Sequence, residues 1–234
     1  MTDQPLKLLA SGRDGDIFEF APGLVLRKTR DGRSIAHEAR TMQYVAEQGF
    51  PVPRIEEVRA DGTEIVMERI EGPIMMDAMV RPPWKLGAHL RLLADLHDRL
   101  HKIDAPDWLP GMPDGGNRLL HLDLHPLNVI MSPTGPVVID WPNARGGDPM
   151  VDVAVTFALV SCGHIPLPRP VAAALNAIRQ PVLRRSFAAR YVGPEFYRRV
   201  AEMAELKCFD ENMAPDEIAA LRALAASSAA KAPG

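Results

Sequence analysis

The chain has 234 residues, of which 47% are hydrophobic and 24% are charged, and its formal net charge is -3. These values are typical of a globular protein with a sizeable core, and they lack the basic excess of a nucleic-acid-binding protein. Cys162 and Cys208 are the only cysteines, so the sequence has no disulfide framework and favours a reducing, cytoplasmic setting. The longest apolar run, residues 151–162, is too short to cross a bilayer, and the first 16 residues lack a signal-peptide pattern. We therefore expect neither nucleic acid nor membrane as a partner.

Short apolar runs separated by turn residues dominate the first third of the chain and predict strands. These runs lie at residues 6–10, 16–20 and 24–28. Residues 34–48 have their apolar side chains at helical spacing and are followed by Gly49, which predicts a helix. Two further runs, 55–60 and 64–69, enclose an Asp-Gly pair and predict a hairpin.

Helical periodicity replaces this strand pattern in the remainder of the chain. Leucines recur every three or four residues over 84–103, and residues 148–225 are mainly helical by the same criterion. The sequence therefore predicts an α+β, bilobal fold. We expect a small β-rich N-terminal lobe of residues 1–70 and a larger helical C-terminal lobe of residues 71–234.

The segment HLDLHPLNVIMSPTGPVVIDW, residues 121–141, places polar side chains beside very apolar runs. One interpretation is a metal site, since alternate residues of a strand share a face and would align His121, Asp123 and His125. However, Pro126 follows directly and no fourth ligand is evident. A second interpretation is an ordinary polar turn between two core strands, because Asp and Asn are common turn residues.

A third interpretation is phosphoryl transfer, which the spacing of three polar side chains favours. The reaction needs a group that accepts the hydroxyl proton and oxygen ligands for the metal ions that neutralise the polyphosphate. Asp123 can be the base. Asn128 and Asp140 can supply a neutral and a charged oxygen to Mg²⁺, and a loop followed by a hairpin could bring the three together.

Three motifs resemble those of the aminoglycoside phosphotransferase family, which has a protein-kinase-like fold. HLDLHPLN resembles the family's HGDLHPGN-type catalytic loop, with Leu122 and Leu127 where the family often has glycine. IDW at 139–141 resembles its metal-binding aspartate motif, and GGDPMVDVA at 146–154 resembles its GDP-x-x-D-L-A segment. The resemblance covers about residues 8–160.

The resemblance also implies nucleotide-binding residues in the N-terminal lobe. SGRDGD at 11–16 stands where the family has its nucleotide-covering loop, which points to Gly12 and Gly15. The phosphate-binding cation of the third strand is Arg27 or its neighbour Lys28, and the family pattern favours Arg27. Glu38 matches the helix glutamate that pairs with that cation.

Further roles follow from the same resemblance. The segment 65–72 resembles the hinge, where the backbone of Glu68 and Ile70 would hold the adenine. Asp152 resembles a buried carboxylate that braces the catalytic loop. We interpret His121 and Trp141 as packing residues. His125 could orient either the loop or the acceptor, and both alternatives stay open.

The sequence thus predicts a phosphotransferase that uses ATP, or GTP, with Mg²⁺ to phosphorylate a hydroxyl of a small molecule. Only eleven residues separate Asp140 from Asp152, which leaves no room for the long activation segment of a protein kinase. A nucleotide-binding protein without catalysis is an alternative from another class, because fold alone does not define function.

The acceptor and the oligomeric state are open. A polycationic aminoglycoside would need carboxylates, and the candidates are Asp107, Asp114, Glu195, Glu202, Glu205, Asp210 and Glu211. Arg198, Arg199 and Lys207 lie among them, and such mixed charge is more typical of a solvated helix face. A physiological small alcohol, sugar or amino alcohol is therefore an alternative acceptor.

Overall fold

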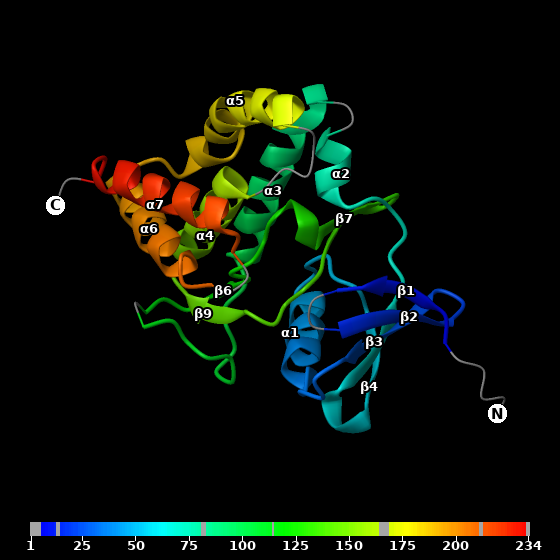
Figure 1. Cartoon of the computed structure of the whole chain (residues 1–234). Coiled ribbons are helices and arrows are strands. Elements are labelled where there is room, and N and C mark those ends of the chain that lie inside the picture. The colour runs from blue at the N-terminus through cyan, green and yellow to red at the C-terminus, as the bar shows by residue number, and fades with distance from the viewer. Residues whose placement is uncertain are drawn as a thin grey trace. The chain divides into compact units, whose positions relative to one another are not determined.

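The computed structural model describes residues 6–12, 15–80, 83–113, 115–163, 169–210 and 213–232 (Figure 1). The chain forms two compact units. The first consists of Met1–Ile74 with Asn128–Ala144, and the second consists of Met75–Leu127 with Arg145–Gly234.

A five-stranded antiparallel sheet with strand order β1-β2-β3-β5-β4 forms the centre of the first unit. Its strands are β1 Leu8–Ser11, β2 Gly15–Ala21, β3 Leu24–Thr29, β4 Ile55–Arg59 and β5 Glu64–Glu68, with a short helix η1 Ala60–Gly62 between β4 and β5. The five predicted strands are therefore present. β3 lies between β2 and β5, so its alternate side chains point to opposite faces of the sheet.

Helix α1, Ala36–Glu47, packs on this sheet through Ala39, which forms a buried cluster with Ile35, directly before the helix, and with Ile65 of β5. The helix ends at Glu47, and Gly49 two residues later has a φ of +76°, a left-handed conformation that glycine adopts at low cost. The helix predicted over 34–48 is thus confirmed, with slightly shorter bounds.

A second hairpin, β7 Val129–Ser132 and β8 Gly135–Val138, also belongs to the first unit. The Val138 N–H donates to the Pro51 carbonyl at 2.8 Å, and the Met131 N–H donates to the Pro73 carbonyl at 2.8 Å. A Cβ at Gly72 would lie 2.2 Å from the Met131 carbonyl oxygen, so only glycine permits this approach.

This grouping differs from the expected continuous lobes, which assigned residues 128–144 to the C-terminal part. The difference has a physical reason. The Trp141 side chain is fully buried, and its ring meets the ring of Phe50 edge-on with centroids 5.7 Å apart. The β7–β8 hairpin therefore belongs to the first unit because it packs against N-terminal residues, although in the chain it follows part of the second unit.

The second unit is mainly helical. Its elements are α2 Met75–Val80, η2 Pro83–Lys85, α3 Leu86–Leu100, β6 Arg118–Leu120, η3 Pro126–Asn128, β9 Arg145–Gly147, α4 Pro149–Cys162, α5 Arg169–Ser186, η4 Ala188–Arg190, α6 Pro194–Lys207 and α7 Pro215–Ala229, with η3 ending at the first residue of the other unit. Helix α4 packs with α6 and α7 (Figure 1), and Ala158, Ala204 and Leu221 form a buried cluster there. None of the described helices is both long and apolar enough to span a membrane.

Candidate active site

The predicted site residues are distributed over both units. Gly12, Gly15, Arg27, Lys28, Glu38, Glu68, Ile70, Asn128 and Asp140 belong to the first unit, and Asp123 belongs to the second.

Arg27 of β3 contacts two carboxylates in the first unit. Its Nη1 forms an ion pair with Glu38 Oε1, and its Nη2 lies 3.7 Å from Asp140 Oδ1. The strand cation, the helix glutamate and the aspartate after β8 are therefore neighbours, and the pairing of Glu38 with Arg27 is the one that the resemblance implied.

Glu38 is buried at the centre of this group. Burial raises the pKa of the Glu38 carboxyl, and the positive charge of Arg27 opposes that shift. The Trp141 backbone N–H also donates to Glu38 Oε1, at 3.3 Å. Glu38 thus holds both the Arg27 guanidinium and the backbone that directly follows Asp140.

Asp140 has its side chain 39% exposed. Its φ of +68° is left-handed, which is uncommon for any residue except glycine and is most often tolerated by Asn and Asp. The chain therefore turns sharply here, and a carboxylate stays accessible beside a cation. Such an oxygen suits a hard divalent metal ion.

Lys28, the neighbour of Arg27, points to the other face of the sheet. Its Nζ lies 3.0 Å from Glu64 Oε1, and more than half of its side chain is exposed. This alternation is the expected consequence of the strand geometry. The structure places Arg27, and not Lys28, beside Glu38 and Asp140.

Asn128 is 7% exposed and stands directly before β7. Its backbone carbonyl accepts the Ile139 N–H at 3.0 Å, which fixes residue 128 opposite the residue before Asp140. The β7–β8 pairing therefore brings Asn128 and Asp140 to the same end of the hairpin.

Gly12 directly follows β1, and Gly15 is the first residue of β2. The Gly12 N–H donates to the Gly15 carbonyl at 2.9 Å. A Cβ at Gly15 would lie 2.4 Å from the Lys28 carbonyl oxygen, so packing of the strands by itself requires glycine there. Residues 13 and 14 lie outside the described part of the chain.

The predicted hinge residues lie at the end of β5. The Glu68 N–H donates to the Arg54 carbonyl at 2.9 Å and is therefore engaged within the protein. Ile70 lies two residues beyond the last pair of the β3–β5 ladder. A nucleotide bound here would meet the Glu68 carbonyl and the Ile70 backbone, which stays a prediction.

Asp152 of α4 holds the start of the segment 121–125, which contains Asp123, in the second unit. Its Oδ2 accepts the His121 N–H at 3.1 Å, and its Oδ1 accepts the Leu122 N–H at 2.7 Å. The predicted bracing role of Asp152 is therefore confirmed. The φ of Leu122 is +61°, the left-handed conformation for which glycine is best suited.

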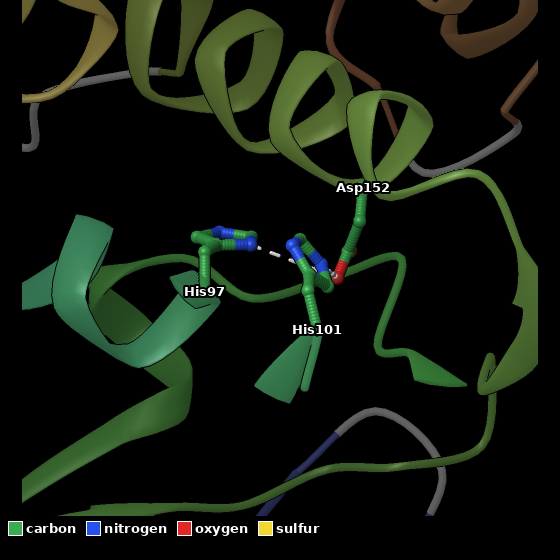
Figure 2. A group of neighbouring side chains, drawn as sticks. All are labelled: His97, His101 and Asp152. Atoms are coloured by element: carbon green, nitrogen blue, oxygen red, sulfur yellow. Dashed lines mark hydrogen bonds and ion pairs between the residues drawn. The ribbon is translucent and has the colours of Figure 1, made fainter. Parts of the chain in front are cut away.

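His97 of α3 and His101, which directly follows that helix, lie beside the same carboxylate (Figure 2). His101 Nε2 lies 3.0 Å from Asp152 Oδ2, and His97 Nδ1 lies 3.6 Å from it. Burial alone would raise the pKa of Asp152, but the two imidazoles outweigh it and hold that pKa well below its usual value. The imidazole nitrogens and the Asp152 oxygen lie close enough together to hold a metal ion. However, the carboxylate already accepts hydrogen bonds from the backbone of His121 and Leu122, which explains its position without a metal.

His97 also reaches the segment 121–125 through Thr156. The Thr156 hydroxyl donates to the Leu124 carbonyl at 2.7 Å, and His97 Nε2 lies 3.0 Å from the same hydroxyl oxygen. Since the hydroxyl has one proton, His97 donates to it from Nε2. α3 and α4 together therefore fix residues 121, 122 and 124 of the segment.

Asp123 lies among these fixed residues, with its side chain 21% exposed. The His125 N–H donates to the Asp123 carbonyl at 3.0 Å, and His125 Nε2 lies 3.5 Å from Asp123 Oδ1. A carboxylate on a rigid, partly exposed segment is suited to accept a proton from a substrate.

The metal interpretation of residues 121–125 rested on a strand, and the structure shows none there. β6 ends at Leu120, and the segment that follows is a turn. His121 is fully buried, whereas Asp123 and His125 are partly exposed. Side-chain alternation therefore does not apply, and the aligned set of His121, Asp123 and His125 was wrong.

The candidate acceptor carboxylates on α6 are paired with arginines of the same helix. Glu195 and Glu202 each contact both Arg198 and Arg199, and Arg199 also contacts Asp148. Asp210 lies 3.2 Å from Lys207. Asp114 and Glu211 lie outside the described residues. This pattern matches the predicted mixed-charge helix face.

A cavity of about 400 Å³ adjoins the same helix. Met203, Leu206 and Phe209 contribute apolar atoms, and Arg198, Arg199, Glu202 and Glu205 contribute charged groups of both signs. The wall of this cavity is therefore mixed and is not predominantly acidic.

Sequence reasoning missed the contributions of His97, His101 and Thr156. The available signal was the four-residue spacing of the two histidines on the leucine face of a helix, since side chains four apart share a face. Polar residues on a buried face require polar partners, and Asp152 was already predicted to be buried.

Comparisons with known proteins identify the family and the fold of the chain. The sequence profile of the Phosphotransferase enzyme family matches residues 5–111 and 106–198. No individually curated protein matches the chain in sequence.

Several solved structures share the fold. A choline/ethanolamine kinase family protein from Mesorhizobium loti is 18% identical, with a TM-score of 0.51 over 98% of this chain and 87% of that one. An aminoglycoside-3'-phosphotransferase of type VIII is 18% identical, with a TM-score of 0.55 over 94% and 92%. The GDP complex of an aminoglycoside 2'-phosphotransferase-IIIa variant is 14% identical, with a TM-score of 0.59 over 98% and 93%.

At these identities, the solved structures establish the protein-kinase-like α+β fold. The family match extends through most of both units and includes all three motifs around Asp123, Asp140 and Asp152. The chain therefore belongs to the Phosphotransferase enzyme family.

Proposed function

We propose that this phosphotransferase moves the γ-phosphoryl group of ATP to a hydroxyl of a small molecule in the presence of Mg²⁺. The single observation that carries the proposal is Asp123, a partly exposed carboxylate on a segment whose neighbouring backbone groups are held by Asp152 and Thr156. Catalysis of phosphoryl transfer consists largely of such positioning and of charge stabilisation.

Asp123 accepts the proton of the acceptor hydroxyl in this proposal. The hydroxyl oxygen forms a bond to the γ-phosphorus, the bond from that phosphorus to the bridging oxygen breaks, and the nucleoside diphosphate leaves. Asp123 contributes by orienting the hydroxyl and by taking its proton as the new bond forms.

Arg27, held by Glu38, binds the nucleotide phosphates in this proposal. Asp140 and Asn128 would hold Mg²⁺, which neutralises the polyphosphate charge when bound. The donor set fits a hard cation, since a 39% exposed carboxylate and an amide lie at one end of the β7–β8 hairpin.

Nucleotides named with similar solved structures support a nucleotide as the second substrate. The structures include a ternary complex with streptomycin and ATP, a complex with ADP and a complex with GDP. We propose ATP as the donor and keep GTP as the alternative. The backbone of Glu68 and Ile70 is the proposed binding segment for the nucleotide's base. Gly12 and Gly15 are proposed to belong to the loop that covers the nucleotide.

For the acceptor, we favour a small alcohol, sugar or amino alcohol over a polycationic aminoglycoside. The α6 carboxylates Glu195 and Glu202 are already neutralised by Arg198 and Arg199. Attracting several ammonium groups would require these pairs to separate.

Both cysteines are free thiols, which fits the proposed location in a reducing cytoplasm.

An acceptor screen with ADP release as the readout tests this function. We expect turnover with at least one small alcohol, its loss when EDTA removes the divalent ion, and a fall of about 10²–10⁴-fold in kcat for Asp123→Ala. Glu57→Gln, a change at an exposed carboxylate of β4, is the control. Nucleotide binding without turnover on any acceptor would instead identify a non-catalytic nucleotide-binding protein.

A further inference from the structure

The imidazole of His125 is held between a backbone group and the proposed base. On one side, the Leu127 N–H donates to His125 Nδ1 at 3.2 Å. On the other side, His125 Nε2 lies 3.5 Å from Asp123 Oδ1. Both side chains are partly exposed, at 19% for His125 and 21% for Asp123.

The contact with Leu127 determines where the imidazole proton lies. A backbone N–H can only donate, so Nδ1 must accept with its lone pair. A neutral imidazole whose Nδ1 is unprotonated carries its proton on Nε2. The Nε2–H therefore points toward the Asp123 carboxylate, for which a donor is the favourable partner.

The backbone reinforces this arrangement. The His125 N–H donates to the Asp123 carbonyl at 3.0 Å, which closes a tight turn and brings the two side chains to the same side. Pro126 then fixes the direction in which the chain enters η3, where Leu127 supplies its N–H. The imidazole therefore has little freedom to rotate away from Asp123.

We propose that His125 is a positioning residue for Asp123. Its Nε2–H restricts rotation of the carboxylate and so sets the direction from which the lone pairs meet the acceptor hydroxyl. The proposal rests on the proposed function, because it gives Asp123 the role of base. It assigns no proton transfer to His125, which keeps the same tautomer throughout the reaction.

A purely structural role for His125 makes a different prediction. In that case, the important atom is Nδ1, which accepts from Leu127 and stabilises the turn before η3. The two roles use different nitrogens of one ring, so two substitutions can separate them. The amide nitrogen of glutamine can stand in for Nε2, whereas the amide oxygen of asparagine can stand in for Nδ1.

The test compares His125→Gln with His125→Asn in the full chain, with an acceptor identified from the screen. Positioning predicts that His125→Asn lowers kcat by about 10- to 100-fold while KM for ATP changes little, and that His125→Gln recovers most of the loss. Thermal unfolding of both variants shows whether the turn is preserved. If His125→Asn is as active as the wild type, or if only His125→Asn is active, the proposal is overturned.

A double-mutant cycle measures the dependence on Asp123 directly. We expect Asp123→Asn combined with His125→Asn to be no slower than Asp123→Asn alone, because His125 then has no base to orient. Additive losses in the double variant would contradict the positioning role.

The tautomer can be measured without any activity. Nitrogen NMR of protein with ¹⁵N-labelled histidine, with the His125 signals assigned through His125→Gln, should show a protonated Nε2 and an unprotonated Nδ1. A protonated Nδ1 would overturn the proposal even if the enzyme is active. If no acceptor is turned over by the wild type, the proposed function fails, while this measurement still decides whether the predicted geometry of His125 exists.

Discussion

The Trp141 backbone N–H donates to Glu38 Oε1 at 3.3 Å, which joins two residues 103 positions apart. The same oxygen pairs with Arg27. One buried carboxylate thus connects β3, α1 and the chain that follows β8, and the position of Asp140 beside Arg27 depends on it.

Glu38→Ala should lower the free energy of unfolding by about 3 kcal/mol, because it leaves the Arg27 guanidinium and the Trp141 N–H without this partner. Glu38→Gln should cost less, since the amide oxygen can still accept from Trp141. Urea unfolding of both variants measures the difference. Equal losses for alanine and glutamine would show that the Trp141 hydrogen bond contributes nothing.

Arg27→Ala should weaken ATP binding by about tenfold or more, whereas Lys28→Ala should change it by less than about twofold. The reason is that Arg27 lies beside Asp140, while Lys28 pairs with Glu64 on the opposite face. Titration calorimetry with ATP and Mg²⁺ gives both affinities. A larger effect of Lys28→Ala would assign the phosphate-binding cation to Lys28.

Asp140→Asn should raise the Mg²⁺ concentration needed for half-maximal turnover by about tenfold or more, since a charged ligand oxygen is lost. Glu64→Gln is the matched control, because it also removes one negative charge from the first unit but at the pair with Lys28. The Mg²⁺ dependence of ADP release measures both. An unchanged Mg²⁺ requirement in Asp140→Asn would remove Asp140 from the metal site.

Asp152→Asn should destabilise the protein by about 3 kcal/mol at neutral pH, because the amide cannot accept from His101, His121 and Leu122 together. The pKa of Asp152 is lowered in the folded protein, so its contribution is fully present above the ordinary value of 3.8 and is lost as the pH falls toward the lowered pKa.

The difference in stability between wild type and Asp152→Asn should therefore shrink as the pH falls below 3.8 toward the lowered pKa. Urea unfolding at several pH values tests this, with Asp107→Asn as the control for loss of an exposed carboxylate. A gap that widens as the pH falls below 3.8 would contradict the lowered pKa.

Local sequence pattern was sufficient for the strands of the five-stranded sheet and for α1 and α3, whereas the bracing role of Asp152 was implied only by the family resemblance. Alternation along β3 could not by itself decide between Arg27 and Lys28, because that choice depends on which face of the sheet α1 covers. The leucine spacing of α3 concealed His97, which lies on the buried face of that helix, and His101, which directly follows it.

The sequence also did not reveal the backbone conformation of the segment 121–125. Residues 121–125 form a turn and not a strand, and Leu122 adopts a left-handed conformation where the resemblance suggested glycine. The hydrogen bond to Asp152 holds Leu122 in the left-handed conformation, which leucine by itself does not favour.

The docked β7–β8 hairpin makes the first unit discontinuous along the chain, with 53 residues of the second unit, Met75–Leu127, inserted between its parts. Domains tend to fold from the N-terminus as the ribosome releases them. When residue 74 emerges, however, the Phe50 ring still lacks Trp141, and the Pro51 and Pro73 carbonyls still lack Val138 and Met131. The N-terminal part of the first unit therefore cannot complete its packing until more than half of the chain has been synthesised.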